Sequence, residues 1–313
     1  MASDALVVTG PTASGKTALS LDVAERLDGE IISMDSRQVY RGMDIGTAKA
    51  TREERRRVPH HGLDIVDPDE RYSAGRFARD ARRWIEEIRG RGRVPILVGG
   101  TGFYLRALTR PLFREPELPD RARGRLERYL ADRSSDVLRA WLRRLDPPTA
   151  EALEGGGGRQ RLARALEVVL LSGRPLSWWH EHSPPEAPPL DPLVFVLELP
   201  RRELYRRIDR RVDAMIEAGL VEEVERLLAE GYDPDDPAMS GTGYAELIPY
   251  LRGETSLEEA ADAIRRATRR YARRQITWFR HQIPPDAIRI DASRPRGERT
   301  EEIVRRWRTA SDR

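Results

Sequence analysis

The residues with the clearest potential for chemistry lie near the amino terminus, in the sequence Gly10-Pro-Thr-Ala-Ser-Gly-Lys-Thr17. Among 55 basic residues the chain has only two lysines, Lys16 and Lys49, and all the others are arginines. Arginine is a planar fork, whereas lysine is a compact ammonium group on a flexible stem. A lysine kept at position 16 therefore indicates a site that needs a point charge, such as the terminal phosphate of a ligand.

The spacing G-x-x-x-x-G-K-T is that of a P-loop. The apolar run 5–9 before it predicts a buried strand, and the apolar spacing through 18–27 predicts a helix. This arrangement directs backbone N–H groups and the positive end of a helix dipole at a phosphate, which disfavours a chance match. We expect Thr17 to bind Mg²⁺. The residues expected to bind a di- or triphosphate are Gly10, Pro11, Thr12, Ala13, Ser14, Gly15, Lys16 and Thr17.

A carboxylate is expected at the same edge of the sheet. In P-loop kinases and ATPases an acid that helps to hold Mg²⁺ follows a second strand, but the apolar run 93–98 leads into Gly-Gly-Thr101. The acid instead follows the strand predicted at 30–34, as Asp35. Because strand carboxyl ends face the ligand crevice of an open α/β sheet, the loop, Asp35 and Thr101 should converge. Asp35 is then either a general base or the cap of the next turn, and spacing leaves both open.

The hydrophobic pattern predicts an α/β fold, with a P-loop parallel sheet flanked by helices and an all-helical insertion domain. We expect the core domain, with its C-terminal helices, to comprise 1–118 and 191–313, and the insertion domain to comprise 119–190. The insertion is helical throughout 118–177 apart from Gly155–Gly158. The elements expected in the rest of the core are a helix at 73–89, a strand at 193–199 and long helices at 201–230 and 257–282.

Composition narrows the class of protein. The chain has no cysteine, and so neither a disulfide nor a cysteine-ligated metal. No apolar run is long enough to cross a membrane, and the first strand begins too near Met1 for a signal peptide, so we expect a cytoplasmic monomer. Residues 262–280 hold seven arginines and a single acid. Such a segment is often a solvated helix face, but its combination with Tyr271 and Trp278 favours nucleic-acid binding.

Several further motifs follow in order along the chain. They are Asp35–Tyr40 as DSRQVY, Gly46–Lys49 as GTAK, Pro95–Tyr104 as PILVGGTGFY, Gln160–Val168 as QRLARALEV, Ser172–Pro175 as SGRP and Thr268–Arg280 as TRRYARRQITWFR. Together with GPTASGKT, this set resembles the tRNA dimethylallyltransferases, also called tRNA isopentenyltransferases, over nearly the full chain. The bacterial form is the closer likeness, because no Cys/His zinc finger follows the core.

The resemblance implies transfer of a dimethylallyl group from dimethylallyl diphosphate to the exocyclic amine of adenosine 37 in tRNA. The P-loop would then hold the diphosphate leaving group, whose charge the backbone, Lys16 and Mg²⁺ on Thr17 would stabilise. By resemblance Asp35 is the base for the weakly nucleophilic amine. Also by resemblance, Thr101 contacts the diphosphate or the reacting region, and Arg123 supplies a second positive group there.

The resemblance further implies that the tRNA anticodon stem-loop is bound, with the target base turned out of its stack. The residues it assigns to tRNA contact are Asp35, Ser36, Arg37, Gln38, Gln160, Arg161, Leu162, Ala163, Arg164, Gly243, Tyr244, Arg273, Arg274, Gln275, Thr277, Trp278 and Arg280. Residues 160–164 also fit a plain amphipathic helix with Leu162 inward, and Trp278 fits a core position better than a base-stacking one.

One position departs from the family pattern: Ala245 stands after Tyr244, where the family usually has a basic residue. Two alternatives remain, a P-loop nucleoside or nucleotide kinase that uses the insertion as a lid, and a non-catalytic RNA-binding module. The missing acid after 93–98 and the DSRQVY motif weigh against the kinase. The expected convergence of Asp35 and Thr101 weighs against the module.

Overall fold

The computed structural model describes residues 3–110, 112–114, 116, 118–154, 158–185 and 187–311. The chain forms two compact units: a core unit, Met1–Arg110 with Pro189–Arg313, and an insertion unit, Pro111–Pro188. The boundaries expected from the sequence were 118/119 and 190/191. Gly155–Gly157, which the sequence predicted to interrupt the helices of the insertion, lie outside the described residues.

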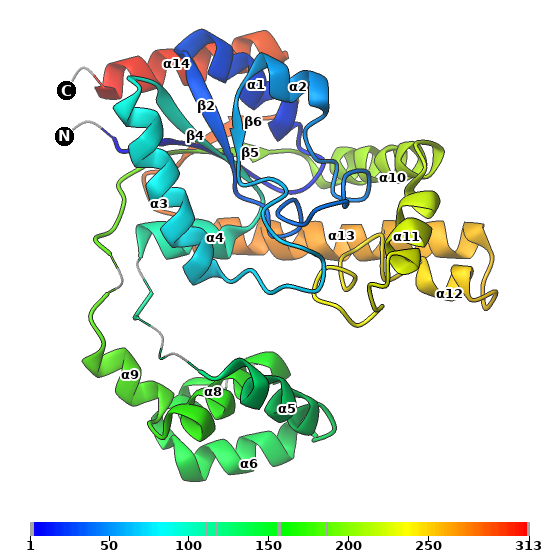
Figure 1. The fold of residues 1–313 in the computed structure, drawn as a ribbon. Helices are drawn as coiled ribbons and strands as arrows, with labels where there is room; N and C mark the ends of the chain where they lie inside the picture. Colours follow the sequence, from blue (N-terminus) through cyan, green and yellow to red (C-terminus); the bar gives the residue numbers. More distant parts are fainter. Residues whose placement is uncertain are drawn as a thin grey trace. The chain divides into compact units, whose positions relative to one another are not determined.

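The core unit is built on a six-stranded parallel sheet in the order β3-β2-β4-β1-β5-β6 (Figure 1). Its strands are β1 (Leu6–Thr9), β2 (Gly29–Ser33), β3 (His60–His61), β4 (Val94–Gly99), β5 (Leu193–Glu198) and β6 (Ile288–Asp291). Every residue of β1 and β2 is buried, as expected where helices cover both faces of a parallel sheet. β1 pairs with β4 and β5, so the segments after these three strands emerge side by side. The predicted fold class is confirmed.

Nine helices belong to the described part of the core unit. They are α1 (Lys16–Leu27), α2 (Arg52–Arg57), α3 (Ala74–Gly90), α4 (Gly102–Thr109), α10 (Arg201–Glu217), α11 (Leu220–Ala229), α12 (Ile248–Leu251), α13 (Leu257–His281) and α14 (Arg296–Ser311). Helices α1 and α14 cover one face of the sheet, and α3, α4 and α13 lie on the other (Figure 1). On the second face Phe77 of α3 stacks on Tyr104 of α4, with ring centroids 4.2 Å apart.

The structure differs from the sequence expectation at three places in the core. The helix expected at 201–230 is two helices, because Gly219 adopts the left-handed conformation with φ 97° between α10 and α11. The short strand β3, which the sequence analysis did not predict, pairs with β2. The sequence did not predict β6 and α14, whose patterns are weak: only Ile290 is buried in β6.

The insertion unit is all-helical, as predicted. Its helices are α5 (Asp120–Ala131), α6 (Ser135–Leu145), α7 (Pro147–Ala152), α8 (Arg159–Ser172) and α9 (Leu176–His182). Leu138 and Leu142 of α6 pack with Leu162 and Leu166 of α8 in a separate small core. The buried carboxylate of Asp146 caps α7 at the Thr149 N–H (3.3 Å) and also accepts from the Ser177 N–H of α9 (3.1 Å). This carboxylate ties two helices together.

The closest backbone approach in the sheet is expected to make Gly99 irreplaceable. A Cβ at Gly99 would lie 1.9 Å from the carbonyl oxygen of Met34, so Gly99→Ala must separate β4 from the segment after β2. We expect a loss of about 1–3 kcal/mol of unfolding free energy, measured by chemical denaturation. Gly90→Ala is the matched control, because nothing lies within 4 Å of its added Cβ. Equal stability of the two variants would contradict this account.

Candidate active site

The loop between β1 and α1 has the backbone of a phosphate-binding loop. Gly10 has φ 142°, and a Cβ there would lie 2.7 Å from the carbonyl oxygen of Leu197 on β5. Gly15, with φ 87°, precedes α1 without a side-chain cap, which leaves the N–H groups of the first turn for a ligand. The Ser14 hydroxyl is buried, with no hydrogen-bond partner among the described residues.

A cavity of about 480 Å³ lies beside this loop. The loop with α1, the segment after β2, Glu54 of α2, the end of β4 with Gly100, and the helices α10 and α13 contribute to it. Its polar lining includes Thr12, Lys16, Thr17, Asp35, Glu54, Arg207, Arg211, Tyr271 and Gln275. The structure thus brings the P-loop and Asp35 together as the sequence predicted. It adds Glu54, Arg207 and Arg211, which the sequence did not single out, and it places at the cavity Tyr271, which the sequence named only for nucleic-acid binding.

Lys16 is held at the floor of the cavity by the loop itself. Its Nζ donates to the carbonyl oxygens of Gly10 (2.9 Å) and Pro11 (2.8 Å). Burial and the nearby Arg211 charge lower the pKa of Lys16 to about 7, against the opposing effect of Asp35. Near neutral pH, therefore, an anion in the cavity would draw a proton onto this amine.

Arg211 is the second cation in the cavity. Burial lowers the pKa of its guanidinium, and Asp35 is the acid that opposes this effect. Its hydrogen bond to the Thr47 carbonyl oxygen is long, 3.5 Å from Nη2. The one-turn spacing of Arg207 and Arg211 was visible in the sequence. Because α10 carries six arginines, that spacing could not distinguish these two from their neighbours.

The structure shows one of the two roles that the sequence left open for Asp35, the cap of a turn. Its Oδ1 accepts from the backbone N–H groups of Arg37 (2.8 Å) and Gln38 (3.4 Å), so one oxygen caps the following turn. The other oxygen, Oδ2, has no hydrogen bond within the part of the chain that the structure describes. A fixed carboxylate with one unused oxygen at a cavity wall has the geometry of a general base.

Thr101 begins α4 next to Asp35. Its Oγ1 accepts from the Ser36 N–H (3.1 Å), and its side chain lies close enough to the Tyr271 hydroxyl to favour a lower pKa of that phenol. Thr101 is therefore in contact with the segment that carries Asp35 and with the α13 wall of the cavity. Its contact with a diphosphate or with reacting atoms remains a prediction.

The other lysine has a structural position. The Lys49 side chain is fully buried, and its Nζ lies 2.6 Å from Asp64 Oδ1, 2.7 Å from Asp44 Oδ1 and 2.7 Å from the Tyr40 carbonyl oxygen. The three protons of an ammonium match these three acceptors, whereas a planar guanidinium would not. Lys49 thereby fixes the GTAK segment, whose residues Thr47 and Ala48 line the cavity.

The same segment is held from the other side by Glu223 of α11. This buried carboxylate accepts from the N–H groups of Asp44 and Ile45 (both 2.8 Å) and Gly46 (3.0 Å), and from the Tyr244 hydroxyl (2.6 Å). Burial beside Glu223 raises the pKa of Tyr244, which stays protonated as the donor. Tyr244, predicted to contact tRNA, is 1% exposed, and its side chain supports the cavity wall instead.

Two other residues predicted to contact tRNA also have internal side chains. Leu162 is fully buried in the core of the insertion unit, as its inward position on an amphipathic helix requires. Gln275 is buried, where its Oε1 accepts from the Thr12 N–H and its Nε2 donates to the Gly100 carbonyl oxygen, both at 2.8 Å. The Leu162 side chain packs in the insertion core, and both amide atoms of Gln275 are used internally. Contact of these residues with tRNA stays a prediction. Gln275 fastens α13 to the P-loop and to the end of β4.

The remaining residues predicted to contact tRNA form two groups, those with internal contacts and those that are exposed. Gln38 bonds internally to Ser33 and to the carbonyl oxygens of Thr47 and Ala48, and Arg37 reaches the Pro237 carbonyl oxygen (2.7 Å). Gly243 is buried in the backbone of its turn, and Trp278 is half-buried against Gly102. The partly or fully exposed members are Ser36, Gln160, Arg161, Ala163, Arg164, Arg273, Arg274, Thr277 and Arg280.

Arg123 lies on α5 of the insertion unit. Its guanidinium is paired with the buried Glu167 of α8 and, at 3.6 Å, with Glu127. Glu167 also pairs with Arg164 at 2.8 Å. These pairs give Arg123 a structural contact within its own unit, and the catalytic role implied for it remains a prediction.

Magnesium fits the donors of the loop. The Thr17 side chain is exposed in the first turn of α1 and lines the cavity. No group of three or more histidine, cysteine or acidic residues suited to a metal occurs in the described chain. One hydroxyl together with ligand phosphates and water is a common way for proteins to hold Mg²⁺. The donor set therefore suits a metal that arrives with a phosphate ligand.

The fold and the loop define a P-loop phosphate-binding protein. The sequence profile described as IPP transferase matches residues 38–282. A tRNA dimethylallyltransferase of Pelotomaculum thermopropionicum is 48% identical over 276 residues, covering 88% of this chain and 87% of that protein. One of Geobacter metallireducens is 50% identical over 275 residues, covering 88% and 89%. The chain belongs to the IPP transferase family.

Solved structures agree with this assignment. The full-length tRNA isopentenylpyrophosphate transferase of Bacillus halodurans matches with a TM-score of 0.71 and 39% identity, over 99% of this chain and 97% of its own. A eukaryotic dimethylallyltransferase, solved acting on tRNA, matches with a TM-score of 0.77 and 30% identity, over 92% and 73%. No helix within the described residues is long and apolar enough to cross a membrane.

The lowered pKa of Lys16 predicts proton uptake when diphosphate binds. At about pH 8, above the pKa of about 7, the amine is mainly neutral in the free protein, and a bound anion stabilises its protonated form. Titration calorimetry in buffers of different ionisation enthalpy should show nearly one more proton taken up than in Lys16→Ala. Affinity should also fall as pH rises above about 7, more steeply than in Lys16→Ala. Equal proton uptake by the two proteins would contradict the assignment.

Proposed function

We propose that this protein is a tRNA dimethylallyltransferase, which transfers a dimethylallyl group from dimethylallyl diphosphate to the exocyclic amine of adenosine 37. The observation that carries the proposal is the presence of two sites in one cavity: a P-loop with partly buried cations, and the Asp35 carboxylate with an unused oxygen. The family membership of the chain and the functions named for its relatives support the same reaction.

The diphosphate is the part of the donor that suits the P-loop side. Bond cleavage leaves negative charge on the diphosphate, and the free amides of α1, Lys16 and Arg211 meet that charge in a partly buried site. Fixed donors aimed at a developing charge usually make the largest contribution to catalysis. When bound, Mg²⁺ on Thr17 would supply further charge stabilisation for the leaving group. Arg211 thus fills the position of a second cation that the resemblance gave to Arg123.

The acceptor side is a second cavity of about 260 Å³ that shares Asp35 with the first. Its other walls include Ser36 and Arg37 after β2 and residues 240–244. An adenine base turned out of the RNA would place its amine near Asp35, because the carboxylate lies on the border between the two cavities. Asp35 would take the amine proton as the new nitrogen–carbon bond forms.

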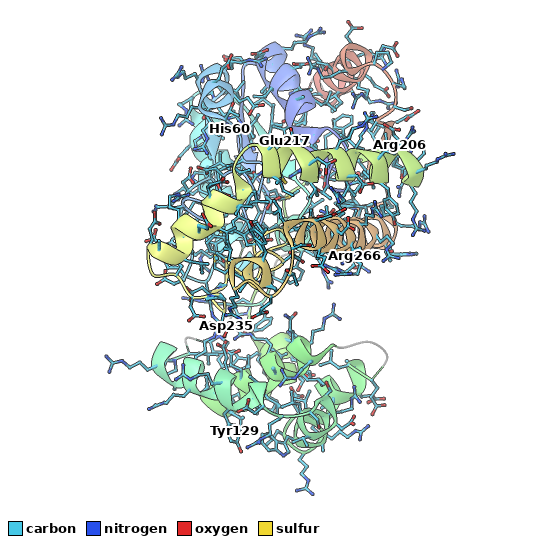
Figure 2. The ribbon with its side chains drawn as sticks, turned by 90° about the vertical axis from the view of Figure 1, so that its right-hand side faces the viewer. His60, Tyr129, Arg206, Glu217, Asp235 and Arg266 are labelled. Carbon is cyan, nitrogen blue, oxygen red and sulfur yellow. The ribbon has the colours of Figure 1, made fainter. Side chains whose placement is uncertain are left out.

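The outer face of α13 supports an RNA partner. Arg265 and Arg269 turn toward α10, which lies alongside α13 (Figure 2), and pair with Asp213 and Asp209 respectively. Four arginines lie on the exposed face of α13: Arg266, Arg270, Arg273 and Arg280. Their spacing of three, four or seven positions places them on one side of the helix. None of them has an ion pair among the described residues. They extend about 21 Å along the helix. An unpaired row of this length suits a sugar–phosphate backbone better than a solvated face does.

A P-loop kinase is the alternative that the loop alone would permit. Such an enzyme needs an acid beside the phosphates to help hold Mg²⁺, whereas β4 ends at Gly99 and is followed by Gly100 and Thr101. The two carboxylates that line the cavity, Asp35 and Glu54, each accept a backbone hydrogen bond, from the N–H groups of Arg37 and Thr51 respectively. The proposal of prenyl transfer is favoured because it needs a base at this point and no second metal ligand.

Asp35→Asn tests the reaction and its base together. With dimethylallyl diphosphate, Mg²⁺ and unmodified tRNA that has adenosine 37, the wild-type protein should form prenylated adenosine, detected by mass spectrometry of digested RNA. The variant keeps an oxygen to cap the turn but loses the base, so kcat should fall about 10²–10⁴-fold. Diphosphate affinity should stay within a few-fold. Hydrolysis of ATP by the wild type without prenyl transfer would refute the proposal, and loss of diphosphate binding in the variant would give Asp35 a metal-binding role.

The exposed arginines of α13 should set the salt dependence of RNA binding. In Arg266→Gln/Arg270→Gln, the slope of log affinity against log salt should be shallower by about 0.7–0.9 for each arginine removed. Turnover at saturating RNA should be unchanged, because these residues lie outside both cavities. Arg305→Gln/Arg308→Gln on the exposed face of α14 removes the same charge and serves as the control. Equal slopes in the two double variants would exclude a local RNA contact.

A further inference from the structure

The two cavities of the active site are lined in part by the same residues. The larger one, beside the P-loop, and the smaller one, toward residues 240–244, have five lining residues in common. These are Thr12, Asp35, Thr47, Arg211 and Tyr271. If the leaving group occupies one cavity and the acceptor base the other, as in the proposed function on which this inference rests, the transferred carbon passes between these five residues.

The charge of three groups changes during the transfer: the diphosphate, the five-carbon group and the Asp35 carboxylate. The bond between the allylic carbon and the diphosphate oxygen breaks, and its electron pair stays on the diphosphate. The lone pair of the adenine amine forms the new nitrogen–carbon bond, and the amine proton moves to the Asp35 carboxylate. Between these events the five-carbon group carries partial positive charge, spread over its allylic carbons. That charge needs a partner that does not itself bond to carbon.

Tyr271 is the aromatic side chain among the five shared residues. It lies on the inner face of α13 and is partly buried, and its hydroxyl is near the Thr101 side chain. Burial and the neighbouring Asp35 raise its pKa to about 12, so the phenol stays neutral and does not attack the donor. The face of an aromatic ring attracts a cation without forming a bond, and the attraction is stronger where water is excluded.

We propose that the ring of Tyr271 stabilises the positive charge on the dimethylallyl group in the transition state. This role belongs to the ring, and the hydroxyl has no part in it. Arg211 and Tyr271 then divide the work at the border between the cavities. The guanidinium meets the negative leaving group, and the ring meets the positive carbon group. Apolar neighbours in the second cavity, Ile208, Val212, Met215 and Ile264, keep water from the reactive carbon.

Tyr271→Phe and Tyr271→Leu separate the ring from the hydroxyl. Single-turnover prenyl transfer should remain within about 3-fold of wild type in the Phe variant. It should fall about 3- to 30-fold in the Leu variant, the range expected for a desolvated cation–π contact. Diphosphate affinity, measured by calorimetry, should be unchanged in both, which also reports that both fold. A Phe variant as slow as the Leu variant would assign the effect to the hydroxyl and overturn the proposal. A Leu variant as fast as wild type would overturn it too.

A graded series gives an independent measurement. Phenylalanines with one, two or three ring fluorines at position 271 keep nearly the same shape while weakening the negative face of the ring. The logarithm of the transfer rate should fall steadily with fluorine number, with no trend in diphosphate affinity. A flat series would refute the ring's role. Absence of prenyl transfer by the wild-type protein would instead refute the proposed function, so the two failures are distinguishable.

Discussion

An excess of buried positive charge is the constraint around which the active site is arranged. Lys16 and Arg211 share a cavity in which Asp35 is the carboxylate that acts on both, and burial lowers the pKa of each cation. Taking charge out of water is costly unless an opposite charge compensates it. The folded protein holds this imbalance in place through β1, α10 and the segment after β2. A phosphate-bearing ligand compensates the excess positive charge, so the site is most stable when such a ligand is bound.

The two lysines show how one residue type meets opposite demands. Lys49 has all three of its protons satisfied by Asp44, Asp64 and a carbonyl oxygen, and it is part of the framework. Lys16 donates only to two carbonyl oxygens of its own loop, which are weaker partners than an anion. The contacts of Lys49 fix a wall of the cavity. The hydrogen bonds of Lys16 can be exchanged for bonds to a ligand.

Much of the fold and part of the site could be predicted from the sequence. Residues that directly follow a strand were predictable, whereas residues that reach the site from helices were not. The P-loop and Asp35 follow directly from strands and can be placed by sheet topology alone. Arg211 and Tyr271 reach the cavity from α10 and α13, and only tertiary packing shows which of many arginines or aromatics turns inward. Gln275 and Tyr244 stand within recognisable motifs, yet their side chains are buried. A motif identifies a position and leaves the direction of its side chain undetermined.

Helix α13 has consequences for how this enzyme family can diversify. One face carries exposed arginines, and the opposite face carries Tyr271 at the cavity and Gln275, which bonds to Thr12 and Gly100. A rotation or shift of the helix that suited a different RNA would also displace the P-loop, to which Gln275 is bonded. Variation in RNA preference is therefore expected to accumulate in surface side chains of α13 or in the insertion unit. The angle of the helix itself is set by its contacts with the P-loop and the end of β4.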